Sequence, residues 1–298
     1  MHNPEERKLH SLEKIVALIA LAAVLALSVG FAQAGGPKKK APAEAAEGPR
    51  LESAVVLVRD AASGETLFAK NEAVVLPIAS ITKLMTAVVM LDSQLSLEQR
   101  VAISADDLDA LKGTHSRLRP GSVLTRNDLL LLALMASENR AAAALARTFP
   151  GGTDAFVAAM NAKAEALRMN DTRFVEPTGL SSGNVSSAQD LARLVAAAHE
   201  YPLVREYSTR ESATVYALGH ALGYRNTNRM LRSGSWEIGL SKTGYISEAG
   251  RCLVMRVRMA SRDLIVVLLD SWGRYSRLGD ANRIRKWLES SALPARRG

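Results

Sequence analysis

The order in which hydrophobic periods change along the chain constrains its fold more than any other sequence feature. Apolar residues alternate with period two between positions 54 and 69, recur at helical spacing between 80 and 200, and return to period two after position 236. Strands from both ends of a domain can pair in one sheet while the helices between them pack as a separate layer. The order therefore predicts an α+β fold, in which an antiparallel sheet built from both chain ends carries an inserted helical subdomain.

The strand predictions rest on alternation and on turn residues. Ser63-Gly64 suits a tight turn between the first two strands. Near the C-terminus, Leu253 and Met255 lie on one side of a predicted strand and Arg256 on the other, which indicates one buried face and one partly wet face. The predicted strands span residues 54–58, 65–69, 236–243, 251–260 and 263–270.

The helix predictions rest on apolar spacing and on end signals. Ser187 and Asp190 have the spacing of a capping box, and Thr153 is placed to cap a helix just after a Pro-Gly-Gly run. The two most strongly helical stretches are interrupted at Ser137-Glu138. The predicted helices span residues 80–91, 125–136, 139–147, 153–168, 187–200 and 280–290.

The first 34 residues have the layout of a secretory signal peptide. Basic residues Arg7, Lys8 and Lys14 precede an apolar run, and a small-x-small triplet ends at Ala34. The run from 15 to 27 is shorter than the ~20 residues that a helix needs to cross the hydrocarbon core. We therefore expect cleavage after Ala34 and no transmembrane anchor in the mature chain.

The remaining chain divides once more by composition. Residues 35–50 are rich in Gly, Pro and Lys and lack hydrophobic periodicity, which indicates a flexible basic tether. From 51 to 298 there is neither a second composition break nor an internal repeat. The predicted organisation is a signal peptide at 1–34, a tether at 35–50 and one folded domain at 51–298.

Composition narrows the possible partners. The chain carries 38 Lys and Arg against 30 Asp and Glu, and its net charge of +8 suits an anionic partner such as a cell-wall polymer. Aromatic residues make up only 5%, and the basic residues are spread along the chain, so nucleic-acid binding is not expected. The single cysteine, Cys252, excludes an intramolecular disulfide and is expected to be unpaired and part-buried. No Cys/His cluster has zinc spacing, so we expect no metal and no other cofactor.

Three short motifs carry the chemistry. The first is an S-x-x-K motif from Ser80 to Lys83 at the start of a predicted helix, where i, i+3 spacing puts the hydroxyl and the amine on one face. A serine hydroxyl is a poor nucleophile unless a neutral base lies beside it, and burial near positive charge can lower the pKa of a lysine enough to supply one. This motif alone is weak, because a second S-x-x-K runs from Ser11 to Lys14 in the signal peptide.

The second motif, Ser137-Glu138-Asn139, lies where two apolar helices are predicted to break. A short loop there can present a hydroxyl and an amide to a cleft. The competing interpretation makes Ser137 an ordinary N-cap of the following helix. A decoy S-x-N runs from Ser182 to Asn184 in a Gly-rich loop.

The third motif, Lys242-Thr243-Gly244, occurs once and ends a predicted strand. Alternation places Lys242 on the same face as Trp236 and Leu240, so its stem can be buried while the ammonium stays at the strand end. Gly244 leaves space for a ligand backbone beside the strand. The competing interpretation is a solvated lysine before a turn.

The motifs, in this order, match the set described for penicillin-binding proteins and class A β-lactamases. Longer blocks, among them PIASITKLMTAVVMLD, LLLLALMASENRAAAALA and VEPTGLSS, resemble the low-molecular-mass penicillin-binding proteins, which are serine D-alanyl-D-alanine peptidases of bacterial cell-wall maturation. Within that family the chain is most similar to the endopeptidase type. The resemblance implies a two-lobed α+β fold of the DD-peptidase and β-lactamase kind, with 51–298 as the catalytic domain.

The resemblance also implies roles for the motif residues. Ser80 would be the acylated nucleophile, Lys83 the base that takes its proton, and Ser137 the relay that passes a proton to the leaving amine. The backbone N–H groups of Ser80 and Tyr245 would form the oxyanion hole. Repulsion from a nearby Lys242 would help to keep Lys83 neutral. The substrate peptide would be bound by Asn139, Lys242, Thr243 and Gly244, with Lys242 and Thr243 at its carboxylate end.

The implied activity is that of a periplasmic, penicillin-sensitive peptidase that cleaves D-alanyl bonds in peptidoglycan cross-links, with β-lactams as covalent inhibitors. Many carboxypeptidases of the family carry an extra β-domain and an amphipathic anchoring helix. Here the chain stops soon after the 280–290 helix, which favours the endopeptidase. Carboxypeptidase action on uncross-linked stems is the first alternative. A β-lactamase that uses Glu176 in deacylation and a non-catalytic wall-binding protein are the others.

Overall fold

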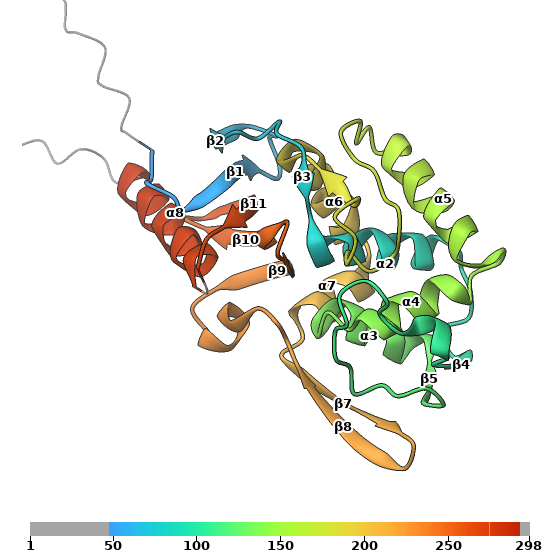
Figure 1. Cartoon of the computed structure of the whole chain (residues 1–298). Helices are drawn as coiled ribbons and strands as arrows, with labels where there is room; N and C mark the ends of the chain where they lie inside the picture. The colour runs from blue at the N-terminus through green and yellow to red at the C-terminus, as the bar shows by residue number, and fades with distance from the viewer. Residues whose placement is uncertain (1–47, 274, 293–298) are drawn as a thin grey trace, which may run out of the picture. The chain divides into compact units, whose positions relative to one another are not determined.

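Strands from the two ends of the chain meet in one antiparallel sheet, as the change of period predicted. The computed structural model describes residues 48–273 and 275–292, and its five-stranded sheet has the order β2-β1-β11-β10-β9 (Figure 1). The signal peptide predicted at 1–34 and most of the predicted tether lie outside the described residues. The strands are β1 (Ser53–Asp60), β2 (Thr66–Lys70), β9 (Glu237–Ile246), β10 (Gly250–Met259) and β11 (Arg262–Ser271).

Helices fill the chain between these strands, close to their predicted positions. Ser187 caps α6 as expected, because its hydroxyl accepts a hydrogen bond from the Asp190 amide at 3.2 Å. The predicted cap at Thr153 is wrong, since α5 begins one residue earlier behind Gly151, which has a φ of 85°. The helices are η1 (Ala79–Ile81), α2 (Thr82–Asp92), α3 (Arg126–Met135), α4 (Asn139–Arg147), α5 (Gly152–Ala166), α6 (Ala188–His199), α7 (Pro202–Thr209) and α8 (Ser276–Ala292).

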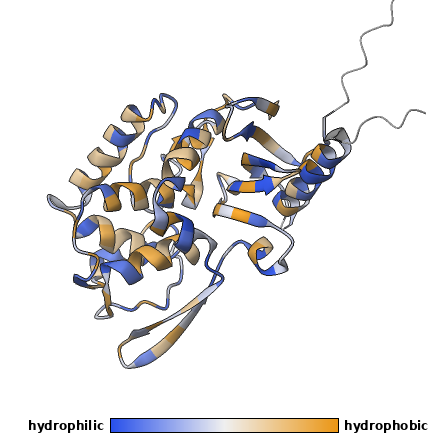
Figure 2. Cartoon of the chain, turned by 180° about the vertical axis from the view of Figure 1, so that it is seen from behind, coloured by the Kyte–Doolittle hydropathy of each residue, from blue (hydrophilic) through white to orange (hydrophobic). Residues whose placement is uncertain are grey.

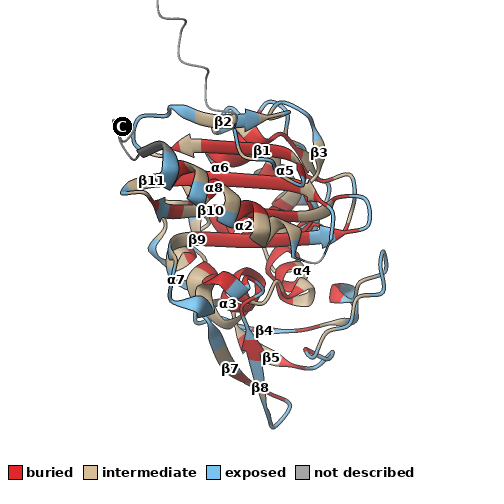
Figure 3. Ribbon diagram, turned by 90° about the vertical axis from the view of Figure 1, so that its left-hand side faces the viewer, coloured by how far each residue is buried: buried red, intermediate tan, exposed pale blue. Residues whose placement is uncertain are grey.

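Several small elements were not predicted. Two of the strand pairs are only two or three residues long, which is too short to show a period. The β7–β8 hairpin buries the face that carries Val215 and Tyr224, but its exposed face also carries a large side chain, Tyr216, which obscures the alternation (Figure 3). Within the described ranges, none of the helices combines the length and the apolar composition that crossing a membrane requires. The small elements are β3 (Leu76–Pro77), β4 (Arg100–Ala102), η2 (Ala105–Asp107), β5 (Val123–Thr125), β6 (Val185–Ser186), β7 (Ser212–Ala217), β8 (His220–Arg225) and η3 (Arg229–Ser233).

Two hydrophobic clusters lie on the two faces of the sheet. On one face α6 packs against β1, β10 and β11, and the cluster continues into the other helices. On the opposite face α8 packs against the same strands through Ala281, Ile284 and Leu288. Hydrophobic residues accordingly recur along the strands and along the helices on either side of them (Figure 2). Burial of a side chain such as Ile284 contributes about 1.5–3 kcal/mol, so α8 is an integral layer of the domain.

Burial along β10 follows the predicted alternation. Leu253 and Met255 belong to the cluster under α8, and Cys252 and Val254 belong to the cluster under the helical region. Cys252 is completely buried rather than part-buried, because both faces of the central strands are covered (Figure 3). Burial raises the pKa of this thiol to about 11, so the cysteine behaves as a core residue.

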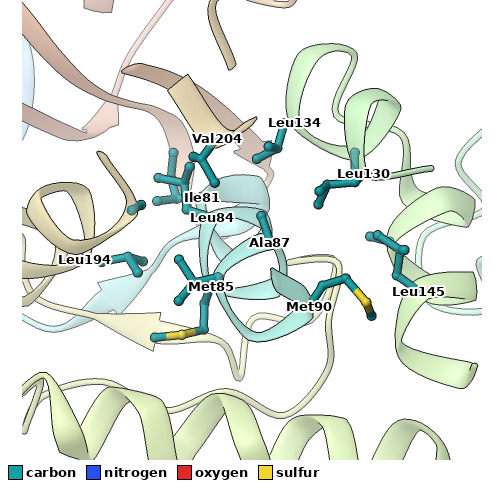
Figure 4. Close-up of a cluster of buried hydrophobic side chains, with 14 of the residues drawn as sticks. Ile81, Leu84, Met85, Ala87, Met90, Leu130, Leu134, Leu145, Leu194 and Val204 are labelled. Atoms are coloured by element: carbon teal, nitrogen blue, oxygen red, sulfur yellow. The ribbon is translucent and has the colours of Figure 1, made fainter. Parts of the chain in front are cut away.

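Helix α2 forms the centre of the helical region. Leu84 and Met85 lie among side chains from α3, α4, α6 and α7 (Figure 4). A helix that is hydrophobic on all sides belongs in the interior of a domain. Since α2 begins just after Ser80 and carries Lys83 in its first turn, its packing holds both residues of the first motif in place.

A bulge at Gly239 changes which side chains of β9 share a face. The register between β9 and β10 shifts at this residue. Leu240 packs toward the helices, whereas Trp236 and Ile238 pack on the side of α8. The prediction that Lys242 shares a face with Trp236 is therefore wrong, because one extra residue reverses the alternation.

Candidate active site

Ser80 lies on a strained turn at the N-terminus of α2. Its neighbour Ala79 has a φ of 47°, in the left-handed region that residues with a side chain rarely adopt. The loop that includes Gly179 closes over this turn, and a Cβ atom on Gly179 would lie 2.0 Å from the Ala79 carbonyl oxygen and 2.8 Å from the Ser80 nitrogen. Gly179 also has a φ of 83°, so both its space and its backbone conformation require glycine. Strain of this kind is typical of functional sites.

The Lys83 side chain is completely buried beside Ser80. Its Nζ donates to Ser80 Oγ at 3.0 Å, to Asn139 Oδ1 at 2.7 Å and to the Thr178 carbonyl oxygen at 2.5 Å. These three acceptors fix the amine on the side of the serine hydroxyl. Burial lowers the pKa of Lys83 from 10.5 to about 8, and the negative charges of two nearby carboxylates oppose that change. A neutral amine is therefore accessible near neutral pH.

Ser137 stands in the break between α3 and α4 with a φ of 58°. Its Oγ accepts a hydrogen bond from Lys242 Nζ at 2.8 Å. The N-cap of α4 is Glu138, whose carboxylate accepts from the Arg140 amide at 3.2 Å. The interpretation of Ser137 as an ordinary N-cap is thus wrong, because the next residue does the capping and leaves the Ser137 hydroxyl to face β9.

Lys242, of the third motif, extends from β9 to the same group of side chains. It is only 1% exposed, and its Nζ also donates to the Thr243 carbonyl oxygen at 3.0 Å. Burial holds the pKa of Lys242 well below its usual value, and the positive charges of Lys83 and Arg277 add to the effect. Lys83 and Lys242 thus lie close enough to repel each other, as expected, although burial is the first cause of the lowered pKa of both lysines.

The edge of the sheet touches the turn that carries the serine. A Cβ atom on Gly244 would lie 3.0 Å from the Ile78 carbonyl oxygen and 3.1 Å from the Ser80 nitrogen, so glycine permits this contact. The Gly244 carbonyl oxygen accepts from Arg277 together with that of Cys252, its partner on β10. The C=O and N–H groups of one trans peptide unit point in opposite directions. The Tyr245 N–H, which belongs to the same peptide unit as the Gly244 carbonyl, therefore points away from the side on which Arg277 binds that carbonyl.

The remaining motif residues line the cleft between these walls. Asn139 Nδ2 donates to Thr114 Oγ1 at 3.1 Å, which ties the amide to the loop after β4. Thr243 Oγ1 donates to Thr227 Oγ1 at 2.7 Å. Beside Asn139 lies a pocket of about 390 Å³ whose apolar lining includes Leu108, Leu111, Pro177 and Leu180. All the motif residues predicted from the sequence thus meet in one place: Ser80, Lys83, Ser137, Asn139, Lys242, Thr243, Gly244 and Tyr245.

Glu176 and Asn184, which the sequence analysis also considered, stabilise the loop between α5 and α6. The Glu176 carboxylate accepts hydrogen bonds from the amides of Thr178 and Gly179, both at 2.6 Å, and from Asn184 Nδ2 at 2.9 Å. Asn184, of the decoy S-x-N motif, is completely buried and also donates to the Thr82 hydroxyl. These bonds shape the loop that presses on Ser80, and they occupy the Glu176 oxygens within the loop itself.

Some contributors to the site escaped sequence reasoning. The Thr178 carbonyl oxygen and the Gly179 backbone act through the main chain, and Arg277 arrives from α8 at the far end of the chain. For Gly179, the sequence did hold a signal. This glycine follows the turn-forming segment Glu176-Pro177-Thr178, where a glycine often marks a special backbone conformation.

Comparisons with known proteins agree with this geometry. The model of a protein family described as peptidase S11, D-alanyl-D-alanine carboxypeptidase, matches residues 42–272. The chain is 48% identical to the D-alanyl-D-alanine endopeptidase of Pseudomonas aeruginosa, over 95% of this chain and 91% of that protein. It is 44% identical to the D-alanyl-D-alanine endopeptidase of Escherichia coli, over 93% of this chain and 89% of that protein.

Solved structures share the fold. The crystal structure of the Streptomyces K15 DD-transpeptidase has a TM-score of 0.75 and 25% sequence identity, and the similarity covers 82% of this chain and 99% of that chain. A D-alanyl-D-alanine carboxypeptidase from Mycobacterium tuberculosis has a TM-score of 0.74 and 26% identity, over 87% of this chain and 98% of that chain. The predicted α+β fold of the DD-peptidase kind is confirmed.

Proposed function

Because the chain belongs to the peptidase S11 family of D-alanyl-D-alanine carboxypeptidases, as its motifs indicated, we propose that it is a serine endopeptidase that hydrolyses D-alanyl bonds in peptidoglycan cross-links. The observation that carries the proposal is the 3.0 Å contact between the buried Lys83 amine and Ser80 Oγ. The endopeptidases of two bacteria that match nearly the full chain support the choice of substrate.

Acylation starts from neutral Lys83. Ser80 Oγ attacks the carbonyl carbon of the D-alanyl residue while its proton passes to Lys83 Nζ. The N–H groups of Ser80 and Tyr245 stabilise the negative charge that develops on the carbonyl oxygen. The C–N bond then breaks, and the leaving amine takes a proton through the Ser137 hydroxyl, so an acyl-enzyme remains on Ser80.

Deacylation repeats these steps with water as the nucleophile. Lys83 takes a proton from the water, the C–O bond to Ser80 breaks, and the serine oxygen regains a proton. A β-lactam acylates Ser80 by the same attack on its ring amide, and its amine stays tethered to the acyl group. We therefore expect penicillin to be a covalent inhibitor.

Binding of the substrate uses both walls of the cleft. The Asn139 amide hydrogen-bonds the peptide from the helical wall, and Lys242 with Thr243 binds the carboxylate on the leaving side. A carboxylate that arrives beside Lys242 raises the pKa of this lysine again, because an opposite charge favours the protonated amine. Gly244 keeps the strand edge open to the peptide backbone.

The enzyme acts in the periplasm, where the polymer that it cleaves is found. The signal peptide predicted at 1–34 supports export, and the net charge of +8 favours retention near a wall polymer that carries carboxylates. Mass spectrometry of the protein from a periplasmic extract is expected to find Gly35 as the first residue. A mature protein that retains residues 1–34 would contradict this assignment.

The proposal is tested by the variant Ser80→Ala. It should lose covalent labelling by fluorescent penicillin and about 10⁶-fold in turnover, since the nucleophile is gone. Ser182→Ala is the matched control, because Ser182 is an exposed serine in the decoy motif. Labelling that persists in Ser80→Ala but disappears in another serine variant would refute the role of Ser80.

A digest of purified muropeptides identifies the reaction. Cross-linked dimers that become monomers mean endopeptidase action. Pentapeptides that lose a terminal D-alanine mean carboxypeptidase action, which is the second candidate and is favoured by the description of the family.

Rapid hydrolysis of nitrocefin with true turnover would indicate a β-lactamase. The occupied Glu176 carboxylate argues against that outcome, because a deacylating base needs a free oxygen for water. Binding of dimers without cleavage would indicate a wall-binding protein.

A further inference from the structure

Three arginines surround a small pocket that the proposed catalytic steps do not use. Arg229 belongs to η3, Arg251 to β10 and Arg277 to the first turn of α8, so they come from three separate parts of the chain. The pocket has a volume of about 180 Å³, and no acidic residue is among those that line it. Its other lining residues are Thr227, Asn228, Tyr275 and Leu278.

The positive charge in this pocket is not neutralised by the described part of the protein. Arg229 donates to the Tyr275 hydroxyl at 3.4 Å, and the Arg251 guanidinium lies over the Tyr245 ring, 4.5 Å from its centroid. Among the described residues, no ion pair to a carboxylate involves any of the three arginines. Unpaired guanidinium groups grouped in this way attract anions, above all planar ones such as carboxylates.

The deepest of the three, Arg277, is held by backbone acceptors. Its guanidinium donates to the carbonyl oxygens of Gly244 at 3.2 Å and Cys252 at 3.3 Å. Its Nε is buried without a hydrogen-bond partner among the described residues. Burial lowers the pKa of Arg277, and the positive charge of Arg251 adds to the effect.

The pocket lies beside the end of the third motif. Thr227, which lines it, accepts the hydrogen bond from Thr243. Arg251 packs on Tyr245, which follows Gly244 at the end of the third motif. A peptide whose first carboxylate lies at Thr243 is therefore next to a residue that lines the arginine pocket.

We propose that Arg229 and Arg251 bind a second carboxylate on the leaving-group side of a cross-linked substrate, an inference that rests on the proposed function. In an uncross-linked stem the leaving group is a single D-alanine, which has one carboxylate. In a cross-link it is a diaminopimelyl residue of a second stem peptide, and that stem carries further carboxylates. Two guanidinium forks can bind such a group with paired hydrogen bonds. The arginine pair thereby selects cross-linked over uncross-linked peptides.

The test compares two substrates in the variants Arg229→Gln, Arg251→Gln and the double variant. For each single variant, kcat/KM on the cross-linked dimer should fall about tenfold, and for the double variant about 100-fold, the scale of lost charge-assisted hydrogen bonds. Hydrolysis of a pentapeptide stem and acylation by benzylpenicillin should stay within about twofold of wild type. Arg258→Gln is the control, because Arg258 is an exposed arginine at the other end of β10.

A chemical change in the substrate gives an independent measurement. Amidation of the acceptor-stem carboxylates other than the one beside the scissile bond, which Lys242 and Thr243 bind, should lower kcat/KM of the wild-type enzyme by the same factor as the double variant. The double variant should cleave the amidated and the free dimer at equal rates. A further loss in that combination would show that the two changes act on different interactions, which would contradict the proposal.

The other outcomes distinguish a failure of this inference from a failure of the proposed function. Equal losses on dimer and pentapeptide would overturn the inference, because the arginines would then act on a group that both substrates share or on the fold. Undiminished cleavage of dimers by the double variant would also overturn it and would leave the proposed function intact. A wild-type enzyme that neither reacts with penicillin nor cleaves either substrate would refute the proposed function, and this inference with it.

Discussion

The two walls of the cleft each contribute a buried lysine, and the surroundings of the two lysines differ in sign. Lys83, on the helical wall, lies near the carboxylates of Glu176 and Glu138, and its pKa is lowered to about 8. Lys242, on the strand wall, lies near Lys83 and Arg277, and its pKa falls well below the usual value. Burial is the first cause in both cases. The nearby charges oppose the effect of burial on the pKa of Lys83 and add to it for Lys242.

This difference separates two tasks that one residue type performs. The helical wall keeps Lys83 able to gain and lose a proton, as a base must be. On the strand wall, the charges that act on Lys242 are positive and lower its pKa until an anion binds. Changes to either wall should therefore affect different steps of the reaction.

The largest effect should follow removal of the amine on the helical wall. Lys83→Met should slow acylation by benzylpenicillin about 10³- to 10⁴-fold, the usual contribution of a general base. In the wild type the acylation rate should rise with pH and level off above about 8, since the neutral form of Lys83 is required. Stopped-flow acylation measures both, with Lys286→Met, at an exposed lysine of α8, as the control. A pH profile that is flat from 6 to 9 would contradict the role of Lys83.

A smaller loss should follow when the two walls are pushed apart. Gly244→Ala places a Cβ atom 3.0 Å from the Ile78 carbonyl oxygen and 3.1 Å from the Ser80 nitrogen, so β9 must move away from the serine. Displacement of this size can cost about 10²-fold in rate. Gly223→Ala is the control, since a Cβ atom there has only one neighbour at 4.0 Å. Unchanged acylation in Gly244→Ala would show that the contact does not position the oxyanion hole.

The buried Lys83 should also reduce the stability of the fold. The pKa of Lys83 is lowered from 10.5 to about 8 on folding, so the penalty for burying its charge is full below pH 8 and disappears as the pH rises toward 10.5. Lys83→Met should therefore raise the free energy of unfolding by about 1–3 kcal/mol at pH 6, after allowance for its lost hydrogen bonds. Urea denaturation at pH 6 and pH 10 measures the difference. A larger gain at pH 10 than at pH 6 would contradict the sign.

The smallest effect should come from a carboxylate that tunes the helical wall. Glu138→Gln removes a charge that raises the pKa of Lys83 but keeps an oxygen that can cap α4. The rise of the acylation rate should then move to lower pH by less than about one unit, with the maximal rate unchanged. A shift to higher pH would show that Glu138 does not act on Lys83 through its charge.

Much of the fold followed from patterns that are local in the sequence. The period of the strands, the capping of α6 by Ser187 and the start of α4 at Asn139 depend on neighbours a few residues away. The bulge at Gly239 and the β7–β8 hairpin were missed, because a bulge is defined by its partner strand and because the exposed face of the hairpin also carries apolar side chains, Tyr216 and Ala221, which obscure its alternation.

The candidate site was likewise predictable only in part from the sequence. The motif residues were identified in the sequence because their order and spacing are specific in combination, yet no local pattern could place Ser137 against Lys242 rather than at a helix N-cap. The same limit applies to the Thr178 carbonyl oxygen and to Arg277. Each acts across a distance along the chain that only folding closes.

The sequence by itself determined the α+β layout, the family and the set of chemical groups at the site. Period, caps and motif residues are properties of short segments, so they can be recognised without coordinates. The tertiary structure alone decided the chemistry of those groups. It buried two lysines among charges of different sign, brought Gly244 against the Ser80 turn and grouped three arginines in a pocket beside the third motif. Burial and the sum of nearby charges depend on residues from all parts of the chain, and they set pKa values and binding.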